Sequence, residues 1–405
     1  MKTVFFDPFG KEKEADGKSS LMELARAAGI PLTSDCGGRK TCGKCRIRLE
    51  TVEGRIPEPT ERETEILGDL TRKGYRLACE TILADGARVH IPEESRTGRQ
   101  VILTSSTSYN YPGRLNPALK PFRVEVPPPV LGRVTADKER LLSALSAGYG
   151  IKNPAIDSQA LKALPNSLRS GARGVDVILF QRKEIIDVRP AGKGGFFGVA
   201  FDMGTTTVAA CLIDLVSGRK MAVKAAMNPQ IPFGEDVLTR IHFCNKEKDH
   251  LGILQSRMMI CMNGLIRDAA QAAGIDATHI LEAVVVGNTA MHHLFAGVVP
   301  KYLAEAPYTP ALQKGEYMKA RDLKLEISPS AYVYLLPVKA GFVGSDAIAC
   351  ALATRIHRRK PATLLIDLGT NGEILFGNNK GVICCSTAAG PAFEGGHIRF
   401  GMRAA

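Results

Sequence analysis

The chain has 405 residues, which is enough for two to four domains. Hydrophobic residues make up 45% and charged residues 23% of the sequence, as in an ordinary globular protein, and no apolar run is long enough for a transmembrane helix. The net charge of +12 is dispersed and comes without a nucleic-acid recognition motif, so neither a membrane nor a nucleic-acid partner is expected.

The first 94 residues are predicted to form a small domain of strands around one helix. A strand is expected in "TVFFDPF" and a helix in "SSLMELARAAGI", which opens with a capping box of Ser20 and Glu23 and ends at Gly29. Strands at "KCRIRLE" and "GARVHIP" follow, with a short helix near "TERETEILGDL" between them. No apolar signal-peptide segment precedes this domain, which favours a cytoplasmic location with reduced thiols.

Three cysteines of this domain lie on one loop, and a fourth lies much later. Five residues separate Cys36 from Cys42, two separate Cys42 from Cys45, and Cys79 stands alone in "YRLACET". Zinc sites usually draw their ligands from two close pairs, so zinc is the alternative here. Three thiolates on a loop and a remote fourth are the plant-type [2Fe–2S] arrangement, with one residue added to the first spacing. The other six cysteines lie in apolar segments and are expected to be buried structural thiols.

These elements together resemble the β-grasp fold of two-iron ferredoxins, and the five-residue gap is closer to the adrenodoxin type. The resemblance covers about residues 1–94 and implies a [2Fe–2S] cluster held by four thiolates. Basic residues beside the cysteine loop offset the cluster charge or steer an acidic redox partner.

The next part of the chain has the composition of a linker followed by a small folded unit. Residues 95–129 mix Ser, Thr and Pro with single apolar residues, which is typical of an interdomain linker. Residues 130–195 are predicted to be a small α/β middle domain, with helices at "DKERLLSALSAG" and "SQALKALPNSLRS" and two strands in "VDVILFQRKEIIDVRP". This domain shows no catalytic cluster and is interpreted as a spacer.

An Asp-x-Gly-Thr turn on an apolar hairpin occurs twice in residues 196–405. Asp202 precedes the first turn, in "FFGVAFDMGTTTVAACLIDLVSG", and Asp367 precedes the second, in "TLLIDLGTNGEILFGN". Backbone amides and hydroxyls of such turns can hold phosphate, and the neighbouring aspartate can hold Mg²⁺ through water. Plain hairpin turns are the alternative. The predicted phosphate-binding residues are Gly204, Thr205, Thr206, Gly369, Thr370, Asn371 and Gly372.

The paired hairpins resemble the two phosphate loops of the ribonuclease H-like ATPase fold shared by actin, hexokinase and Hsp70. The helix predicted in "GSDAIACALA" resembles the hinge helix of that fold, where Asp346 would orient a Mg²⁺-bound water or simply cap the helix. The resemblance makes Asp202, Asp367 and Asp346 the catalytic candidates. Helix-start roles are expected for Glu235 and Asp236.

Two adjacent histidines, His292 and His293, are a tempting metal site, but neighbouring residues on a helix point in different directions. They are therefore expected to serve packing or capping rather than to bind one metal ion.

Ferredoxin, linker, middle domain and ATPase, in that order, resemble the ATP-dependent reductive activators of corrinoid proteins. Further stretches carry this resemblance, among them "NPQIPFGEDVLTRI", "VVVGNTAMHHLFAG" and "AGFVGSDA". It implies an anaerobic, ATP-hydrolysing activator that passes an electron from the cluster to Co(II) and restores Co(I). The implied partners are a corrinoid protein or methyltransferase component and an upstream reductase, and a homodimer is compatible with the sequence.

Two other functions stay open at this point. One is a ferredoxin-type electron carrier whose ATPase-like half only docks a partner or is vestigial. The other is a metabolite kinase of the same superfamily, although no catalytic base can be assigned for it.

The chain ends about 38 residues after Asp367. In the resembled fold, the adenosine-binding glycine pair lies well beyond that point. A C-terminal truncation, an incomplete ATPase domain and an exposed apolar surface are therefore expected.

Overall fold

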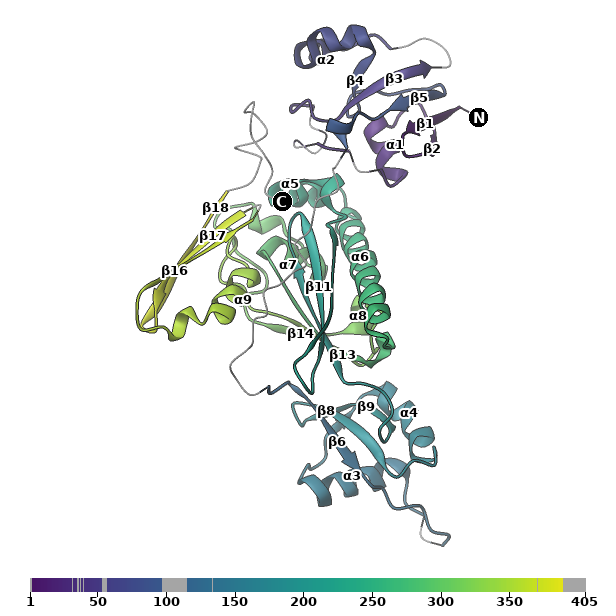
Figure 1. The fold of residues 1–405 in the computed structure, drawn as a ribbon, viewed down its shortest axis with the longest axis vertical. Coiled ribbons are helices and arrows are strands. Elements are labelled where there is room, and N and C mark those ends of the chain that lie inside the picture. The colour runs from purple at the N-terminus through teal and green to yellow at the C-terminus, as the bar shows by residue number, and fades with distance from the viewer. Residues whose placement is uncertain are drawn as a thin grey trace.

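The computed structural model describes residues 2–30, 32–34, 36, 38, 40–52, 57–96, 115–132, 134–369 and 371–388. Three bodies follow one another along its long axis, with the sheet of β16–β18 at the side of the central body (Figure 1). Four sheets carry the architecture, and the predicted fold class, a multidomain α/β and α+β chain, is confirmed.

The N-terminal body is a five-stranded sheet in the order β2-β1-β5-β3-β4, with β1 and β5 parallel. Its strands are β1 (Thr3–Asp7), β2 (Lys11–Glu14), β3 (Arg46–Val52), β4 (Tyr75–Leu77) and β5 (Ala87–His90), and its helices are α1 (Leu21–Ala27) and α2 (Glu61–Leu67). The predicted capping box of Ser20 and Glu23 opens α1. A second capping box, Thr60 with Glu63, opens α2. The expected β-grasp topology is confirmed.

The body at the opposite end is a four-stranded sheet in the order β6-β8-β9-β7, covered by two helices. Its elements are β6 (Leu119–Val124), α3 (Asp137–Tyr149), β7 (Ala155–Ile156), α4 (Ser158–Leu168), β8 (Val175–Phe180) and β9 (Glu184–Pro190). Strand β6 lies inside residues 95–129, the predicted linker. It pairs antiparallel with β8 and buries Leu119, Phe122 and Val124, so this part of the segment belongs to the sheet.

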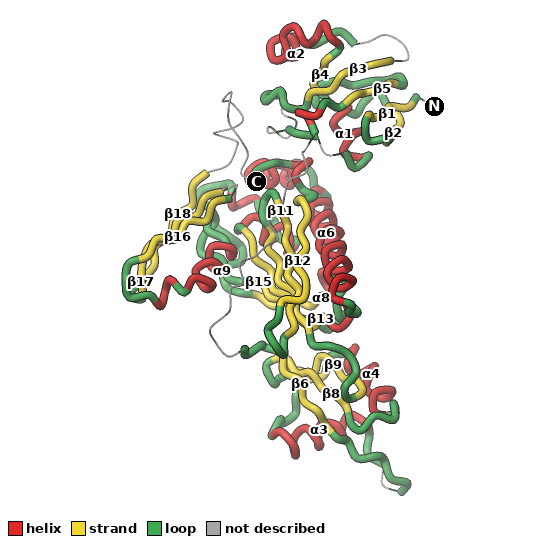
Figure 2. Tube along the Cα trace, viewed as in Figure 1, coloured by secondary structure: helices red, strands yellow, loops and turns green. Residues whose placement is uncertain are grey.

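The central body is a six-stranded sheet in the order β12-β11-β10-β13-β15-β14. Helix α6 runs along the sheet (Figure 2) and contributes to the largest apolar core. Strands β10, β13 and β15 are parallel, so their carboxyl ends meet at one edge, where open α/β sheets bind ligands. The elements are β10 (Phe197–Met203), β11 (Thr207–Asp214), β12 (Lys220–Met227), α5 (Val237–Lys246), α6 (His250–Ala273), β13 (Ile280–Gly287), α7 (Thr289–Ala296), β14 (Glu316–Lys319), α8 (Ala320–Leu323) and β15 (Tyr332–Leu335).

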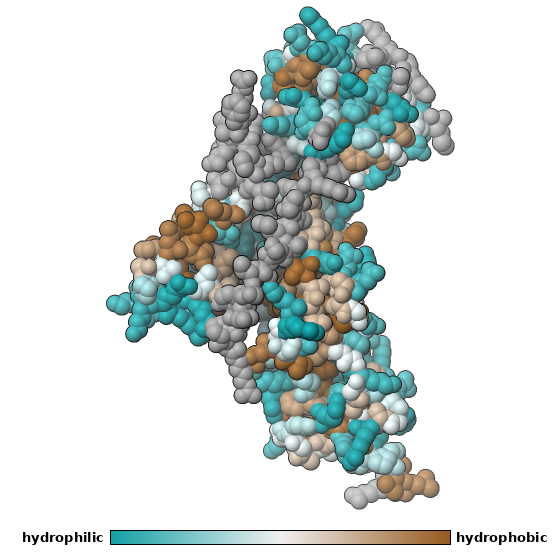
Figure 3. Space-filling view, in the orientation of Figure 1, coloured by the Kyte–Doolittle hydropathy of each residue, from teal (hydrophilic) through white to brown (hydrophobic). Residues whose placement is uncertain are grey.

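The last sheet is antiparallel, β16-β17-β18, and follows helix α9. Its elements are α9 (Ser345–Thr354), β16 (Thr363–Leu368), β17 (Asn371–Asn378) and β18 (Gly381–Ala388). The basic run of residues 355–360 before Pro361 predicts that the helix closes with this run, since cations suit a helix C-terminus, but α9 ends at Thr354 because Arg355 takes a left-handed φ of 54°. Every second side chain of β16 is exposed, including Leu368 at 83%, and apolar residues gather over this sheet (Figure 3). This agrees with the expected exposed apolar surface.

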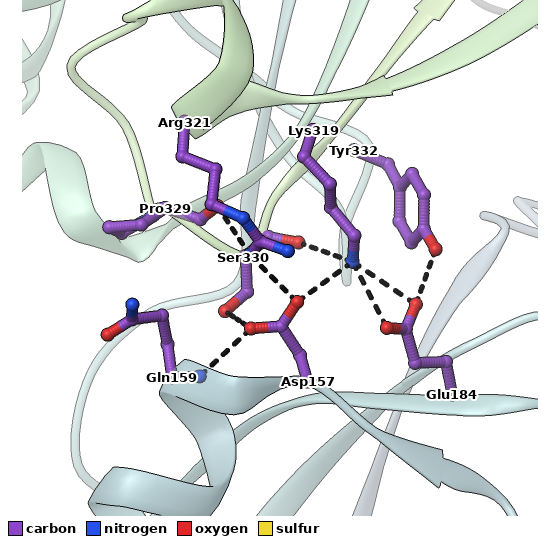
Figure 4. A network of polar contacts seen from close by, with 8 residues as sticks. All are labelled: Asp157, Gln159, Glu184, Lys319, Arg321, Pro329, Ser330 and Tyr332. Carbon is purple, nitrogen blue, oxygen red and sulfur yellow. Dashed lines mark hydrogen bonds and ion pairs between the residues drawn. The ribbon is translucent and has the colours of Figure 1, made fainter.

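A network of polar side chains joins the small four-stranded sheet to the central sheet (Figure 4). Asp157, at the start of α4, accepts hydrogen bonds from Arg321 at 2.8 Å and from Ser330 at 2.8 Å. Lys319 binds Glu184 at 3.1 Å and lies 3.8 Å from the centre of the Tyr332 ring, while the Tyr332 hydroxyl donates to Glu184. Charged and neutral contacts therefore cross this junction.

Among the helices that the structure describes, none combines the length and apolarity that a bilayer span requires.

Candidate cluster and nucleotide sites

The four cysteines of the N-terminal domain come together as two pairs. Cys36 and Cys42 are hydrogen-bonded to each other, as are Cys45 and Cys79. The second pair follows from the sheet: Cys45 directly precedes β3, Cys79 follows β4, and the Ala78 amide donates to the Cys45 carbonyl at 2.8 Å. Cys36, Cys45 and Cys79 are buried, and Cys42 is half-buried.

Within each pair, one thiol stabilises the thiolate of the other. The hydrogen bond from Cys42 lowers the pKa of Cys36 to about 3 and raises that of Cys42. The hydrogen bond from Cys79 lowers the pKa of Cys45, and the pKa of Cys79 is raised by the same contact. Thiolates are the form that binds iron.

This arrangement fits a two-iron cluster better than a single ion. Each iron of a [2Fe–2S] cluster takes two cysteine thiolates, so two pairs match two irons. In the described part of the chain, no three His, Cys, Asp or Glu side chains are grouped as one ion would require. The Arg26 guanidinium of α1 lies within electrostatic reach of Cys36, Cys45 and Cys79, which the sequence alone did not indicate.

The first predicted phosphate loop connects β10 to β11, and side chains and backbone of residues 228–240 donate hydrogen bonds to its carbonyl groups. The Asn228 side chain donates to the Gly204 carbonyl at 2.7 Å, and the Asn228 amide donates to the Thr206 carbonyl at 2.8 Å. The Arg240 guanidinium donates to the Thr205 carbonyl between them. Fixing three successive carbonyls restricts the peptide planes and therefore the direction of the loop amides, as an anion site requires.

Arg240 is the largest fully buried side chain of the described residues. Besides Thr205, its guanidinium donates to the Gly234 carbonyl at 2.8 Å and lies 3.0 Å from the Met291 sulfur. Burial lowers its pKa to about 9, although the negative charges of Asp236 and Glu235 act in the opposite direction and raise it. Little in the sequence indicates that Arg240 is buried. The one sign is its place on α5 beside Ile241, which is also buried.

The structure brings the three predicted aspartates close enough to repel one another. Desolvation raises the pKa of Asp202 to about 6, with added repulsion from Asp346 and Asp367. Asp202 is accessible to solvent, so the crowding around it, rather than full burial, causes this desolvation. Desolvation also raises the pKa of Asp346 to about 6. Carboxylates that repel each other are stabilised by a cation such as Mg²⁺.

Glu373 is a fourth carboxylate in this acidic cluster, and its position in the sequence gives no sign of this role. It is 5% exposed and lies directly opposite Asp367 in the β16–β17 ladder. Desolvation, followed by the charges of Asp346 and Asp367, raises its pKa to about 7. On α9, the Cys350 thiol faces Asp367 at 3.5 Å, and desolvation raises its pKa to about 12.

The second phosphate loop connects β16 to β17 and is one residue shorter than the first. The Gly369 amide donates to the Asn371 carbonyl at 3.2 Å, and Gly372 pairs with Leu368. Thr370, also predicted to bind phosphate, lies outside the described residues.

One cavity of about 1310 Å³ has walls from both the cluster domain and the second phosphate loop. Gly38 and Cys79 line it on one side, Asn371 on another, and the starts of α5 and α7 complete it. Residues of the predicted cluster site and of the second predicted phosphate loop therefore line one cavity.

The remaining sequence candidates have structural roles in this region. Asp236 caps α5 by accepting from the Thr239 amide at 2.8 Å, as expected for a helix-start acid. Both ring nitrogens of His293 are engaged, with the Thr289 carbonyl and the Ala311 amide. His292 is fully buried, and burial lowers its pKa to about 4, so it is a neutral core residue.

Residues 4–84 match the 2Fe-2S iron-sulfur cluster binding domain, residues 110–194 the RACo linker region, and residues 197–359 the RACo middle region. Residues 361–405 match the C-terminal domain of RACo, the ASKHA domain. The RACo linker region thus includes the small four-stranded sheet.

Two relatives and one solved structure are informative. The chain is 30% identical to the corrinoid activation enzyme RamQ of Eubacterium limosum, over 99% of this chain and 63% of RamQ. It is 27% identical to the [Co(II) methylated amine-specific corrinoid protein] reductase of Methanosarcina barkeri, over 51% and 39% of the two chains. The solved reductive activator for corrinoid,iron-sulfur protein has 33% identity and a TM-score of 0.65, over 100% of this chain and 65% of that one.

Fold and site define a protein class in which a [2Fe–2S] ferredoxin domain precedes an ASKHA-type nucleotide fold. The chain matches the linker region, the middle region and the C-terminal domain of RACo in that order, and it is similar to the corrinoid activation enzyme RamQ along nearly its whole length. It spans 63% of the length of RamQ and 65% of the solved activator.

Proposed function

We propose that the protein carries out ATP-dependent reductive activation of a corrinoid protein, passing one electron from its cluster to Co(II) and regenerating Co(I). The observation that carries this proposal is the shared cavity, which is lined by the cluster residue Cys79 and by Asn371 of the second phosphate loop. The names of the relatives support a corrinoid partner.

Nucleotide is needed because the electron transfer is uphill. A plant-type cluster has a reduction potential near about −400 mV, and Co(I) is a strong reductant. An opposing gap of about 0.2 V costs about 5 kcal/mol for one electron. A ligand that moves a two-state equilibrium from 1:99 to 99:1 supplies about 5.5 kcal/mol, so nucleotide-driven closure has the required size.

The proposed cofactor-binding residues form two groups, one for the iron-sulfur cluster and one for ATP with Mg²⁺. Cys36, Cys42, Cys45 and Cys79 would hold the cluster, which supplies one-electron transfer when bound. The two phosphate loops would hold the phosphates of ATP, with Gly204 and Gly369 allowing close approach of the backbone. A side chain at Gly204 would place its Cβ 2.7 Å from the Thr207 carbonyl oxygen, so this loop requires glycine. Asp202, Asp346 and Asp367 would hold Mg²⁺ directly or through water.

The proposal extends to the setting of the reaction. The electron acceptor is a corrinoid protein or a corrinoid methyltransferase component, and a separate reductase reduces the cluster. The reaction takes place in the cytoplasm under anaerobic conditions, where low-potential electrons and free thiols persist. The protein acts without nucleic acid or membrane, and a homodimer is compatible with this chemistry.

The test is optical observation of Co(I) formation. Cluster-loaded, prereduced protein is mixed anaerobically with a Co(II) corrinoid protein, with and without ATP and Mg²⁺. Formation of Co(I) that requires ATP is the expected result. Reduction that is indifferent to ATP would instead identify an electron carrier with a docking domain. If a competent corrinoid protein is not reduced in either case, another partner or a metabolite kinase becomes the better hypothesis.

A further inference from the structure

One turn of the central body contacts the cysteine loop directly and is linked to the first predicted phosphate loop through Arg240. The turn consists of Gly234, Glu235 and Asp236 and leads into α5. On one side, Arg240 of α5 donates both to the Gly234 carbonyl and to the Thr205 carbonyl of the first phosphate loop. The position of the turn and the position of the loop are therefore tied to one buried guanidinium.

On its other side, the same turn reaches the cysteine loop of the ferredoxin domain. The Glu235 carboxylate accepts a hydrogen bond from the Ser34 amide at 3.0 Å. The Ser34 hydroxyl accepts from the Gly38 amide at 3.1 Å and lies 3.9 Å from the Cys36 sulfur. Ser34 is 3% exposed, so these contacts are shielded from water.

The turn packs closely on α5. A Cβ at Gly234 would lie 2.8 Å from the Arg240 amide nitrogen, which shows how closely the turn packs on α5. Asp236 is engaged in capping α5 through the Thr239 amide and hydroxyl. Of the two acidic residues of the turn, Glu235 is therefore the one that contacts the cysteine loop.

We propose that Glu235 is a positioning residue that couples the first phosphate loop to the [2Fe–2S] loop through Ser34. This inference rests on the proposed function, which supplies the nucleotide and the cluster. Phosphate on the loop and an electron on the cluster would each shift the same chain of contacts: Thr205, Arg240, Glu235 and Ser34. Nucleotide occupancy would thus change the environment of Cys36.

The charge of Glu235 is expected to change the reduction potential of the cluster in one direction. A carboxylate beside the cluster disfavours the added negative charge of reduction, so it lowers the reduction potential. Coupling between two sites is reciprocal, so a nucleotide that changes the potential must bind oxidised and reduced protein with different affinities. A tenfold affinity ratio corresponds to a 59 mV shift for one electron.

The experiment measures binding of a non-hydrolysable ATP analogue with Mg²⁺ to oxidised and to reduced cluster-loaded protein, together with the potential of the cluster. Wild type is compared with Glu235→Ala and Glu235→Gln. Glu247→Gln, at the other end of α5 and also on the cavity wall, is the matched control. Iron content is measured in every variant to verify cluster loading.

In wild type, the analogue is expected to bind the two redox states with affinities that differ at least threefold. Glu235→Ala should bring this ratio close to one. Glu235→Gln keeps an acceptor for the Ser34 amide, so it should keep most of the ratio while the potential becomes more positive. Glu247→Gln should behave as wild type.

Equal affinities for the two redox states in wild type, or an unchanged ratio in Glu235→Ala, would overturn the inference. Either result, in a protein that still reduces cobalt in an ATP-dependent manner, would leave the proposed function intact. Redox-dependent nucleotide binding without cobalt reduction would instead support the coupling and contradict the proposed acceptor.

Discussion

Glu373 carries a carboxylate that the fold holds out of solvent and opposite Asp367. Like charges across a strand pair are destabilising, and burial adds to the cost. The shift of its pKa to about 7 corresponds to a cost on the order of 3 kcal/mol when the carboxyl is ionised. We expect a cation held by the neighbouring aspartates to offset this cost.

Glu373→Gln is expected to stabilise the metal-free protein at pH 8 by about 1–3 kcal/mol. The pKa of Glu373 lies above the ordinary value of 4.5, so the folded state binds more protons than the unfolded state between about pH 4.5 and 7. The free energy of unfolding therefore falls as the pH rises through this window, and the substitution should flatten that fall. Urea denaturation at several pH values measures it, with the exposed Asp268→Asn as control.

Saturating Mg²⁺ should reduce the advantage of Glu373→Gln, because the cation offsets the repulsion in the wild type. Equal unfolding curves for wild type and Glu373→Gln at pH 5.5 and pH 8 would contradict the assigned repulsion.

A second residue-scale prediction concerns the thiols. Cys79→Ala should abolish cluster loading, measured as bound iron and visible absorption, because one iron loses one of its two thiolates. Cys261→Ala is the matched control. That thiol is half-buried on α6, where burial raises its pKa to about 11, and its removal should leave the iron content unchanged. Full iron content in the Cys79 variant would exclude it as a ligand.

At the scale of elements, α5 and the turn before it are joined to the first predicted phosphate loop by one buried side chain. Arg240 satisfies carbonyls of both the turn and the first phosphate loop from inside the core. A buried carbonyl left without its donor costs about 1–3 kcal/mol, so the loss of this side chain affects both stability and loop geometry.

Arg240→Leu is expected to lower the free energy of unfolding by about 2–4 kcal/mol and to weaken nucleotide binding about tenfold or more. Urea denaturation and calorimetric titration with an ATP analogue measure the two effects. Arg257→Leu, at an exposed position of α6, should change stability by about 0.5 kcal/mol or less. Unchanged nucleotide affinity in Arg240→Leu would show that the loop keeps its shape without the guanidinium.

At the scale of the whole molecule, the junction in Figure 4 joins the small four-stranded sheet to the central sheet. Asp157 is 4% exposed and receives contacts from Arg321, Ser330 and Lys319. Burial alone would raise its pKa, but hydrogen bonds from the Gln159 amide, Arg321 and Ser330 and the charge of Lys319 lower it to about 2. Its contribution to stability is therefore present above about pH 4 and lost as the pH falls through about 2.

Asp157→Asn tests the junction while preserving the cap of α4, since asparagine is an equally good N-cap. We expect a loss of about 2 kcal/mol, less than for a fully buried ion pair, because Arg321 stays partly exposed. Scanning calorimetry should show the small sheet unfolding earlier. Glu326→Gln removes the exposed pair with Arg267 and should cost less than 1 kcal/mol. Equal decreases in the free energy of unfolding for the two variants would show that the junction contributes no more to stability than an exposed ion pair does.

Local features were predictable because neighbouring residues encode them. Contacts within a few residues determine three such features. They are the cysteine spacing, the capping box at Ser20 and the two hairpins with their Asp-x-Gly-Thr turns. The β-grasp and ATPase classes followed from the order of such elements. The end of α9 was missed because the basic run after Thr354 suits a helix C-terminus as well as the turn that follows it.

The tertiary structure decided what depends on residues far apart in the chain. Strand register places Glu373 opposite Asp367, and packing brings Arg240 to Thr205 and Glu235 to Ser34. Strand β6 reads as linker in the sequence, because its buried residues are separated by Pro, Lys and Arg, and only its pairing with β8 makes it a strand. Local patterns in the sequence thus predict most of the elements and the kind of chemistry expected at each site. The structure decided which sites share one cavity, because long-range packing has no periodic signature in a single sequence.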